Sequence, residues 1–285
     1  MTPRGGRASR LLRNTPTLLL LCVLGVYFLI PIVWMTIAST KDTPDLNSTP
    51  GFEFAHFNFF DNMANLFQRD DGIFGRWLIN SAIYSGLGGL GATLLAVMAG
   101  YALAKYKFPF REGIFRIILG GVLVPGAVLA LPVYLLLSNM GLVNTYAGVL
   151  LPALVTPFGV YLGRIYAADA VPDEMLEAAR IDGAGELRTF ATISMRMLAP
   201  ATATIFLFQF VAIWNNFLLP LILISNQRLY PVTLGLYGWQ GQARNTPDLV
   251  SLIVAGSFVA TLPLIVIFLF SQRFWRAGLA AGALK

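Results

Sequence analysis

The sequence predicts an all-α integral membrane protein with six transmembrane helices. Apolar residues make up 56% of its 285 residues and charged residues only 12%, against about 25% charged residues in an average soluble domain. The charges also avoid several stretches of about 20 residues, the length that a helix needs to span a bilayer. These apolar runs are continuous, whereas membrane β-strands alternate apolar and polar residues, so we expect helices rather than a barrel.

Six apolar stretches are long enough to span the membrane. They cover residues 17–37, 77–103, 114–137, 146–166, 201–225 and 249–270. The first is too long for a cleaved signal peptide, and the sequence around Pro31 offers no small-residue cleavage site, so we predict a retained helix. Prolines interrupt the stretches and predict kinks. They are Pro31, Pro125, Pro132, Pro152, Pro157, Pro220 and Pro263.

Basic residues predict which side of the membrane each connecting segment faces. With the amino terminus in the cytoplasm, 15 of the 20 Lys and Arg residues fall in cytoplasmic segments. They are Arg4, Arg7, Arg10, Arg13, Lys105, Lys107, Arg111, Arg116, Arg164, Arg180, Arg188, Arg196, Arg273, Arg276 and Lys285. The positive-inside rule therefore places both termini in the cytoplasm. Basic anchors facing anionic lipid also explain the net charge of +6, so we expect no nucleic acid partner.

This orientation divides the chain into cytoplasmic, membrane and outer segments. We predict a basic cytoplasmic segment at 1–16, a first span at 17–37, an outer loop at 38–76, a membrane core at 77–270 and a cytoplasmic tail at 271–285. Within the core, a cytoplasmic loop at 167–200 joins the fourth and fifth spans, and an outer loop covers 226–248.

The sequence lacks the residues that several kinds of chemistry require. It contains no G-x-x-x-x-G-K-[ST] phosphate loop, so the chain is not expected to hydrolyse ATP by itself, and we assign no catalytic residue. Cys22 and His56 are the only residues of their types, which leaves no disulfide and no Cys/His metal cluster. No Asp or Glu lies within the six stretches, whereas ion-coupled carriers usually place ionisable groups there. Any transport would therefore be passive or driven by another chain.

The cytoplasmic loop carries the most informative pattern. Residues 171–183 predict a short helix, because Pro172 suits a first turn, two acidic residues follow it, and Gly183 favours a stop. Residues 184–200 predict a second, amphipathic helix. Its apolar face consists of Leu187, Phe190, Ile193 and Met197.

Physical chemistry alone leaves two interpretations of this loop. An amphipathic helix can simply lie on the lipid surface. Alternatively, the small side chains of Ala178 and Ala179 let a partner surface approach closely, while Glu177 and Asp182 offer charges to basic partner residues.

The string Glu177-Ala178-Ala179, followed after three residues by Gly183 and after nine more by Ile193, resembles the EAA signature of permease subunits in binding-protein-dependent ABC importers. The longer string from Val171 to Ala184 resembles the carbohydrate branch of that family. Further similar strings are Asn80-Ser81, Ala99-Gly100-Tyr101-Ala102-Leu103-Ala104, Gly141-Leu142-Val143-Asn144-Thr145, Trp214-Asn215-Asn216-Phe217-Leu218-Leu219-Pro220, and Gly278-Leu279 with Gly282-Ala283-Leu284-Lys285. Together they resemble the second, six-helix permease of maltose-type sugar importers. One departure is Ser194-Met195-Arg196, where the family pattern has Leu-Pro.

The resemblance implies a function for the EAA loop, as we call residues 167–200. In the family, this loop supplies a coupling helix that sits in a cleft of a cytoplasmic ATPase subunit. The implied docking residues are Glu177, Ala178, Ala179 and Gly183, with Arg180 and Asp182 as polar contacts. ATP and Mg would bind to the ATPase, with no cofactor on this chain. The implied partners are a second, different permease chain, two ATPase subunits, an extracytoplasmic solute-binding protein or lipoprotein, and membrane lipid. The implied place is the bacterial cell membrane, where the complex would move a carbohydrate or sugar derivative inward.

Two further groups of residues are candidates for contact with the solute or its binding protein. Polar amides in apolar helices face protein or a cavity, so we name a candidate translocation path, although helix-to-helix hydrogen bonding explains each amide equally well. The path consists of Asn80, Gln209, Trp214, Asn215 and Asn216. In the outer loop, aromatic and amide side chains suited to sugars stand beside glycines that give flexibility; the alternative is an interfacial anchor. This candidate binding-protein contact consists of Tyr237, Gly238, Trp239, Gln240 and Gly241.

Two other functions compete with an importer subunit. A secondary carrier or facilitator would work without an ATPase, against which stand the absent intramembrane acids and the docking pattern. A membrane anchor or sensor would need only the docking loop, and it leaves the amides and prolines of six spans unexplained.

Overall fold

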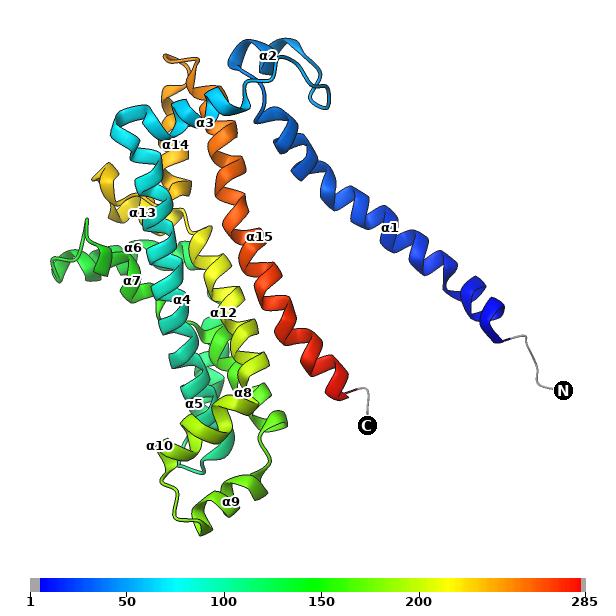
Figure 1. Cartoon of the computed structure of the whole chain (residues 1–285). Coiled ribbons are helices and arrows are strands. Elements are labelled where there is room, and N and C mark those ends of the chain that lie inside the picture. The colour runs from blue at the N-terminus through cyan, green and yellow to red at the C-terminus, as the bar shows by residue number, and fades with distance from the viewer. Residues whose placement is uncertain (1–5, 283–285) are drawn as a thin grey trace. The chain divides into compact units, whose positions relative to one another are not determined.

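The computed structural model describes residues 6–282, and their secondary structure is helical, joined by turns (Figure 1). Side chains are described for residues 16–274. The described chain falls into two units, Met1–Gln68 with Trp239–Val259, and Arg69–Gly238 with Ala260–Lys285. The predicted basic amino terminus and the carboxyl-terminal string ending in Lys285 lie outside the described side chains.

The first unit begins with a long apolar helix, α1 (Gly6–Ala38), whose side chains from residue 16 to residue 34 are all exposed. Two short helices follow, α2 (Thr43–Ser48) and α3 (Phe59–Gln68), in the segment predicted to be an outer loop. The buried Lys41 holds this segment, because its Nζ donates to Thr49 Oγ1 and to the carbonyl of Pro50, both at 2.8 Å.

The second unit contains the remaining helices, of which α14 and α15 cross the boundary between units. They are η1 (Arg69–Gly72), α4 (Ile73–Lys105), α5 (Arg111–Val122), α6 (Gly126–Asn139), α7 (Tyr146–Ala153), α8 (Pro157–Ala170), α9 (Asp173–Ile181), α10 (Glu186–Thr189), η2 (Phe190–Ser194), α11 (Met195–Met197), α12 (Ala199–Trp214), α13 (Leu218–Leu223), η3 (Gln227–Leu229), α14 (Val232–Gln242) and α15 (Leu249–Gly282). The tail predicted at 271–285 is thus helical as far as Gly282.

Three of the predicted spans fall in single helical segments and three in bent helix pairs. The single segments long and apolar enough to cross a membrane are Pro16–Ala38, Phe59–Lys105 and Leu249–Phe274. The second of them includes a kink, because Asp70, Asp71 and Gly72 adopt positive φ angles between α3 and α4. Three further helix pairs are long and apolar enough to cross a membrane only when both members are counted as one span. They are α5 with α6, α7 with α8, and α10–α11 with α12, and they bend by 104°, 40° and 80°. The predicted stretch 201–225 is also interrupted, since α12 ends at Trp214 and α13 starts at Leu218.

Only some of the prolines break a helix. Pro125 precedes α6 and Pro157 opens α8, and in both places the residue before the proline is disfavoured in a helical conformation, which ends the preceding helix. By contrast, Pro31, Pro132 and Pro263 lie inside continuous helices. The proline positions therefore indicate where a helix can be interrupted, but they do not specify at which of these positions it is.

The core of the second unit is built on α4, which packs along both α8 and α12. Glycine allows the closest approach, because a Cβ added to Gly100 would lie 2.5 Å from the backbone carbonyl carbon of Gly163 and from the nitrogen of Arg164. A Cβ added to Gly163 would lie 2.9 Å from the carbonyl oxygen of Ala96. Small residues at such crossings are typical of membrane helices, where close backbone packing supplies much of the association energy.

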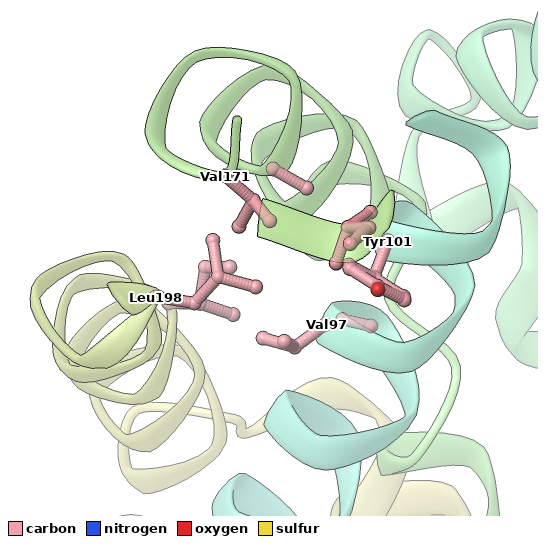
Figure 2. Packing of buried hydrophobic residues seen from close by; sticks show 8 residues of the cluster. Val97, Tyr101, Val171 and Leu198 are labelled. Carbon is pink, nitrogen blue, oxygen red and sulfur yellow. The ribbon is translucent and has the colours of Figure 1, made fainter. Parts of the chain in front are cut away.

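A buried apolar cluster joins α4, α8, α9 and α12 at one end of the bundle. Figure 2 shows four of its members, Val97, Tyr101, Val171 and Leu198, pointing toward one another. Leu176 of α9 also belongs to this cluster. The short helix α9 is therefore anchored in the same core as the long helices.

Candidate functional site

The predicted short helix of the EAA loop is confirmed as α9, Asp173–Ile181. Pro172 stands at its N-cap with φ −64°, and two acidic residues occupy its first turn. Gly183 adopts φ +76°, a left-handed conformation that costs glycine little, and Ala184 then donates its N–H to the carbonyl of Ala179 at 2.9 Å. The chain therefore turns sharply at the position that the sequence predicted as the helix stop.

The two alanines of the EAA string differ in exposure. Ala179 is buried together with Leu176, whereas Glu177 and Ala178 are exposed. The prediction that both alanines admit a partner surface is therefore wrong for Ala179. The structure assigns Ala179 to intramolecular packing instead, because it lies three residues after Leu176 and so on the same face of the helix.

Large apolar side chains stand exposed beside the predicted docking residues. Ile181 is 87% exposed, Leu187 80% and Met175 44%. Two of these, Ile181 and Met175, were missed as candidate contacts; the signal that could have found them is their position outside the face that carries Leu176. Large apolar side chains exposed on a loop are candidates for burial against another protein.

Charged residues attach α9 to its neighbours. Arg180 Nε pairs with Glu186 Oε1 at 2.8 Å, and Lys105 Nζ pairs with Asp173 Oδ1 at 2.8 Å. The Arg180 guanidinium and then the Tyr106 hydroxyl, both bonding to the carboxylate, lower the pKa of Glu186, and the hydrogen bond from Lys105 lowers the pKa of Asp173. Arg180 thus already has a partner within the chain, whereas Asp182 and Gly183 remain exposed without a described ion pair.

The predicted second helix of the loop is shorter and less regular than expected. Instead of one helix over 184–200, helical turns run from Glu186 to Met197 with a π-helical segment, and an 80° bend then leads into α12. At the place where the family pattern has Leu-Pro, Ser194 is buried and donates its hydroxyl to Tyr101 Oη at 3.1 Å. Pro200 lies in the first turn of α12, where its missing N–H costs nothing.

Three helix breaks meet at one cavity in the membrane-spanning part of the second unit. The cavity has a volume of about 850 Å³ and is lined by Val124 from the α5–α6 break, Val155 from the α7–α8 break, and Asn215 to Phe217 from the α12–α13 break. Non-helical backbone at membrane depth is tolerated where it is buried in protein or lines a water-filled cavity. Its convergence at one place marks this cavity as the candidate solute site.

The structure divides the predicted translocation path. Asn215 and Asn216 line this cavity, and Gln209 lines a second one of about 420 Å³ that shares Val155, Pro157 and Gly121 with the first. Gln209 is also bonded within the chain, since its Nε2 donates to Thr156 Oγ1 at 2.7 Å.

Asn80 and Trp214 lie outside both cavities. Asn80 is fully buried and donates to the carbonyls of Arg228 and Tyr230, both at 2.9 Å, while its Oδ1 accepts from the Tyr146 hydroxyl at 2.7 Å. Trp214 is buried and donates to the carbonyl of Ala260 at 3.2 Å. The contacts of these two residues therefore match the alternative stated above, hydrogen bonding within the protein, and not a place on the translocation path.

The predicted outer contact loop is helical. Residues 237–241 lie within α14, so the glycines there do not create a flexible loop. Tyr237, Gln240 and Gly241 are exposed, but Trp239 is only 3% exposed and does not present its ring to a partner in this conformation. The prediction of a flexible loop is wrong because a glycine costs a helix only about 1 kcal/mol and does not by itself end it.

Comparison with known proteins identifies the family. The family described as "Binding-protein-dependent transport system inner membrane component" matches residues 92–279. The chain belongs to this family. Its members are membrane components of transport systems, so the chain is a permease component and not an enzyme.

Similar permeases include several whose names specify sugars. Over 225 residues the chain is 35% identical to the arabinooligosaccharides transport system permease protein AraQ of Halalkalibacterium halodurans, covering 79% of each chain. Over 228 residues it is 31% identical to the melibiose/raffinose/stachyose import permease protein MelC of Bacillus subtilis, covering 79% of this chain and 81% of the relative. Over 265 residues it is 28% identical to the trehalose/maltose transport system permease protein MalG of Thermococcus litoralis, covering 92% and 94%.

The fold is shared with a solved importer. A crystal structure of a bacterial ABC transporter involved in the import of the acidic polysaccharide alginate contains a chain that superposes with a TM-score of 0.79 at 20% sequence identity. The superposition covers 95% of this chain and 99% of that chain.

Proposed function

We propose that this chain is the membrane-spanning subunit of an ABC importer that moves a carbohydrate or sugar derivative inward, driven by ATP hydrolysis on a separate ATPase subunit docked at the EAA loop. The observation that carries the proposal is the exposed surface of the EAA loop, where Glu177, Ala178 and Ile181 of α9 and Leu187 of α10 are all exposed. Burying such apolar side chains against a partner contributes about 25 cal/mol per Å² of apolar area.

We propose six spans with both termini in the cytoplasm, where the EAA loop lies between the fourth and fifth. The support is the three continuous helices and three bent pairs, together with the excess of basic residues in the segments assigned to the cytoplasm. The exposed apolar surface of α1 fits lipid or the second permease chain. The membrane is the bacterial cell membrane, as the description of the family as an inner membrane component suggests.

The solute path of the proposal is the cavity at the three helix breaks. Asn215 and Asn216 supply hydrogen-bond donors and acceptors, and Phe217 supplies an aromatic face of the kind that stacks on a sugar ring. None of the described residues around the two adjoining cavities carries a charge. Because an unpaired charge is costly in such surroundings, the lining favours an uncharged solute.

The partners of the proposal are a second permease, two ATPase subunits that bind ATP and Mg, and an extracytoplasmic solute-binding protein or lipoprotein. A structural neighbour with a TM-score of 0.60 was crystallised as an alginate ABC transporter in complex with an alginate pentasaccharide-bound periplasmic protein. Tyr237, Gln240 and Gly241 are exposed on α14 and are the residues we assign to the binding-protein contact.

Co-purification of the chain from its native membrane in mild detergent tests the proposal. We expect a stoichiometric ATPase with a phosphate loop and a second permease. A single-chain oligomer without an ATPase, active in solute uptake without ATP, would favour the secondary carrier instead. As a matched pair, Glu177→Lys on the exposed face should release the ATPase, whereas Glu53→Lys in the predicted outer segment should retain it.

A further inference from the structure

Two consecutive residues at the end of α4 hold both ends of α9. At the first residue of α9, Asp173 Oδ1 accepts from Lys105 Nζ at 2.8 Å. Near its last turn, Arg180 Nε pairs with Glu186 Oε1 at 2.8 Å, and the other oxygen of Glu186 accepts from the Tyr106 hydroxyl at 2.7 Å. The helix is therefore tied to the end of α4 directly at its first residue, and through Glu186 of α10 near its last turn.

These bonds are of the strong, charge-assisted kind. The Lys105 side chain is only 6% exposed, whereas that of its partner Asp173 is 75% exposed, so the burial of this contact comes from the side of α4. Asp173 stands at the amino terminus of α9, where the helix dipole favours a negative charge. Glu186 is shared by a guanidinium and a phenol, which fixes the direction of both carboxylate oxygens.

Apolar packing joins the same two helices between the polar ties. Leu176 of α9 lies in one buried cluster with Val97 and Tyr101 of α4. The ring of Tyr101 also contacts that of Tyr106, with centroids 5.8 Å apart. In contrast, the chain that follows α9 turns at Gly183 and contributes no buried side chain before Thr189.

The far end of α4 holds a different part of the second unit. Near its start, Asn80 and Tyr84 donate to backbone carbonyls between Arg228 and Tyr230, at 2.9 Å each. The helix has 33 residues without a described break and is therefore about 50 Å long. A displacement imposed on α9 thus has a direct route, through one helix, to the segment that precedes α14.

We infer that Lys105 and Tyr106 are positioning residues that lock α9 to α4, so that movement of the docked helix drives α4 instead of being absorbed by the turn after Ile181. The inference rests on the proposed ATPase docking at α9. It predicts that breaking either tie uncouples ATP hydrolysis from transport while the ATPase stays bound.

Two double-mutant cycles in the complete importer, reconstituted with its binding protein, test this inference. The first combines Lys105→Met with Asp173→Asn, and the second combines Tyr106→Phe with Glu186→Gln. The readout is solute moved per ATP hydrolysed, with bound ATPase measured in the same preparation. Asp169→Asn is the control, because Asp169 is exposed on α8 and has no ion pair among the described residues.

We expect each single variant to lower the transport ratio at least about threefold. The double variants should lower it no further than Asp173→Asn and Glu186→Gln alone, since Lys105→Met and Tyr106→Phe remove contacts that these acidic-residue changes already remove. Asp169→Asn should keep the wild-type ratio. Multiplying effects in the double variants, or unchanged ratios in all of them, would overturn the inference even though ATP-driven transport by the wild type persists. Absence of the ATPase from the wild-type complex would instead refute the proposed function itself.

A covalent tie provides a rescue that loss of folding cannot imitate. Cys22 is the only cysteine, so Cys22→Ser gives a background in which Lys105→Cys and Asp173→Cys can be joined by a short thiol crosslinker. We expect the transport ratio to recover on crosslinking and to fall again when a cleavable linker is cut. A ratio that stays low although the crosslink has formed would overturn the role assigned to Lys105.

Discussion

The crossing of α4 and α8 predicts a large difference between two otherwise identical substitutions. Gly86 and Gly100 both lie in α4, but a Cβ on Gly86 meets nothing within 4 Å, whereas one on Gly100 meets the backbone of α8 at 2.5 Å. Ordinary contacts of a Cβ begin at 3.4 Å. Gly100→Ala therefore forces the two backbones apart by almost an ångström.

The magnitudes follow from two opposing effects. Replacing glycine by alanine inside a helix stabilises it by about 1 kcal/mol. Overpacking costs about 3 kcal/mol at the upper end of its range, which applies here because the clash is with backbone rather than with a flexible side chain. We thus expect Gly86→Ala to stabilise the chain by about 1 kcal/mol and Gly100→Ala to destabilise it by about 2 kcal/mol.

Thermal denaturation of the full chain in one detergent measures this difference. Folded chain remaining after heating, followed by size-exclusion chromatography, gives the apparent midpoint for each variant. Gly163→Ala should behave like Gly100→Ala, since its added Cβ would lie 2.9 Å from the carbonyl oxygen of Ala96. A midpoint for Gly100→Ala equal to or above that of Gly86→Ala would refute the close crossing.

Four further predictions concern the sites. Asn80→Leu removes three hydrogen bonds at about 0.5–1.5 kcal/mol each, two of them to the carbonyls of Arg228 and Tyr230, so hydrogen exchange should accelerate at residues 228–232; unchanged exchange would contradict the role of Asn80 in holding this segment. Gly183→Val places a β-branched residue at φ +76° at a cost of about 1–2 kcal/mol, and ATP-driven uptake should fall at an unchanged amount of chain; normal uptake by a normally assembled complex would count against coupling at this turn. Asn216→Leu should lower solute uptake while ATPase binding persists, and equal uptake would remove Asn216 from the path. Because the pKa values of Glu186 and Asp173 are lowered in the folded chain, the ties of α9 should be constant above about pH 5 and weaken only as pH falls through those lowered values; a spin label at Ala178 that becomes mobile already near neutral pH would disagree.

Local signals in the sequence predicted the EAA loop helix well. Pro172, the acids of the first turn and Gly183 act within a few residues, so the bounds of α9 follow from backbone chemistry alone. The sequence did not predict which of Ala178 and Ala179 is buried. That depends on which face of α9 packs against Val97 and Tyr101, and no neighbouring residue in the sequence specifies this contact.

Predictions that depended on distant contacts succeeded least. Asn80 appears in the sequence as a polar residue in an apolar helix, but its partners are carbonyls of Arg228 and Tyr230, about half the chain away. The cavity could not be predicted from the sequence either, since it forms only where three helix breaks from separate stretches meet. Composition predicted the apolar stretches, but proline positions did not indicate which of them are interrupted, since Pro132 and Pro263 lie inside helices.

The charge-free cavity wall has a consequence for the membrane in which the chain sits. Most of that wall is aliphatic, with polar groups concentrated at Asn215 and Asn216. A wall without charges offers an ion no partner that could replace its hydration shell, so entry of a bare ion is very costly. We therefore expect that an idle path between transport cycles leaks neither protons nor sodium, so the cell keeps its membrane potential while the pathway stands empty.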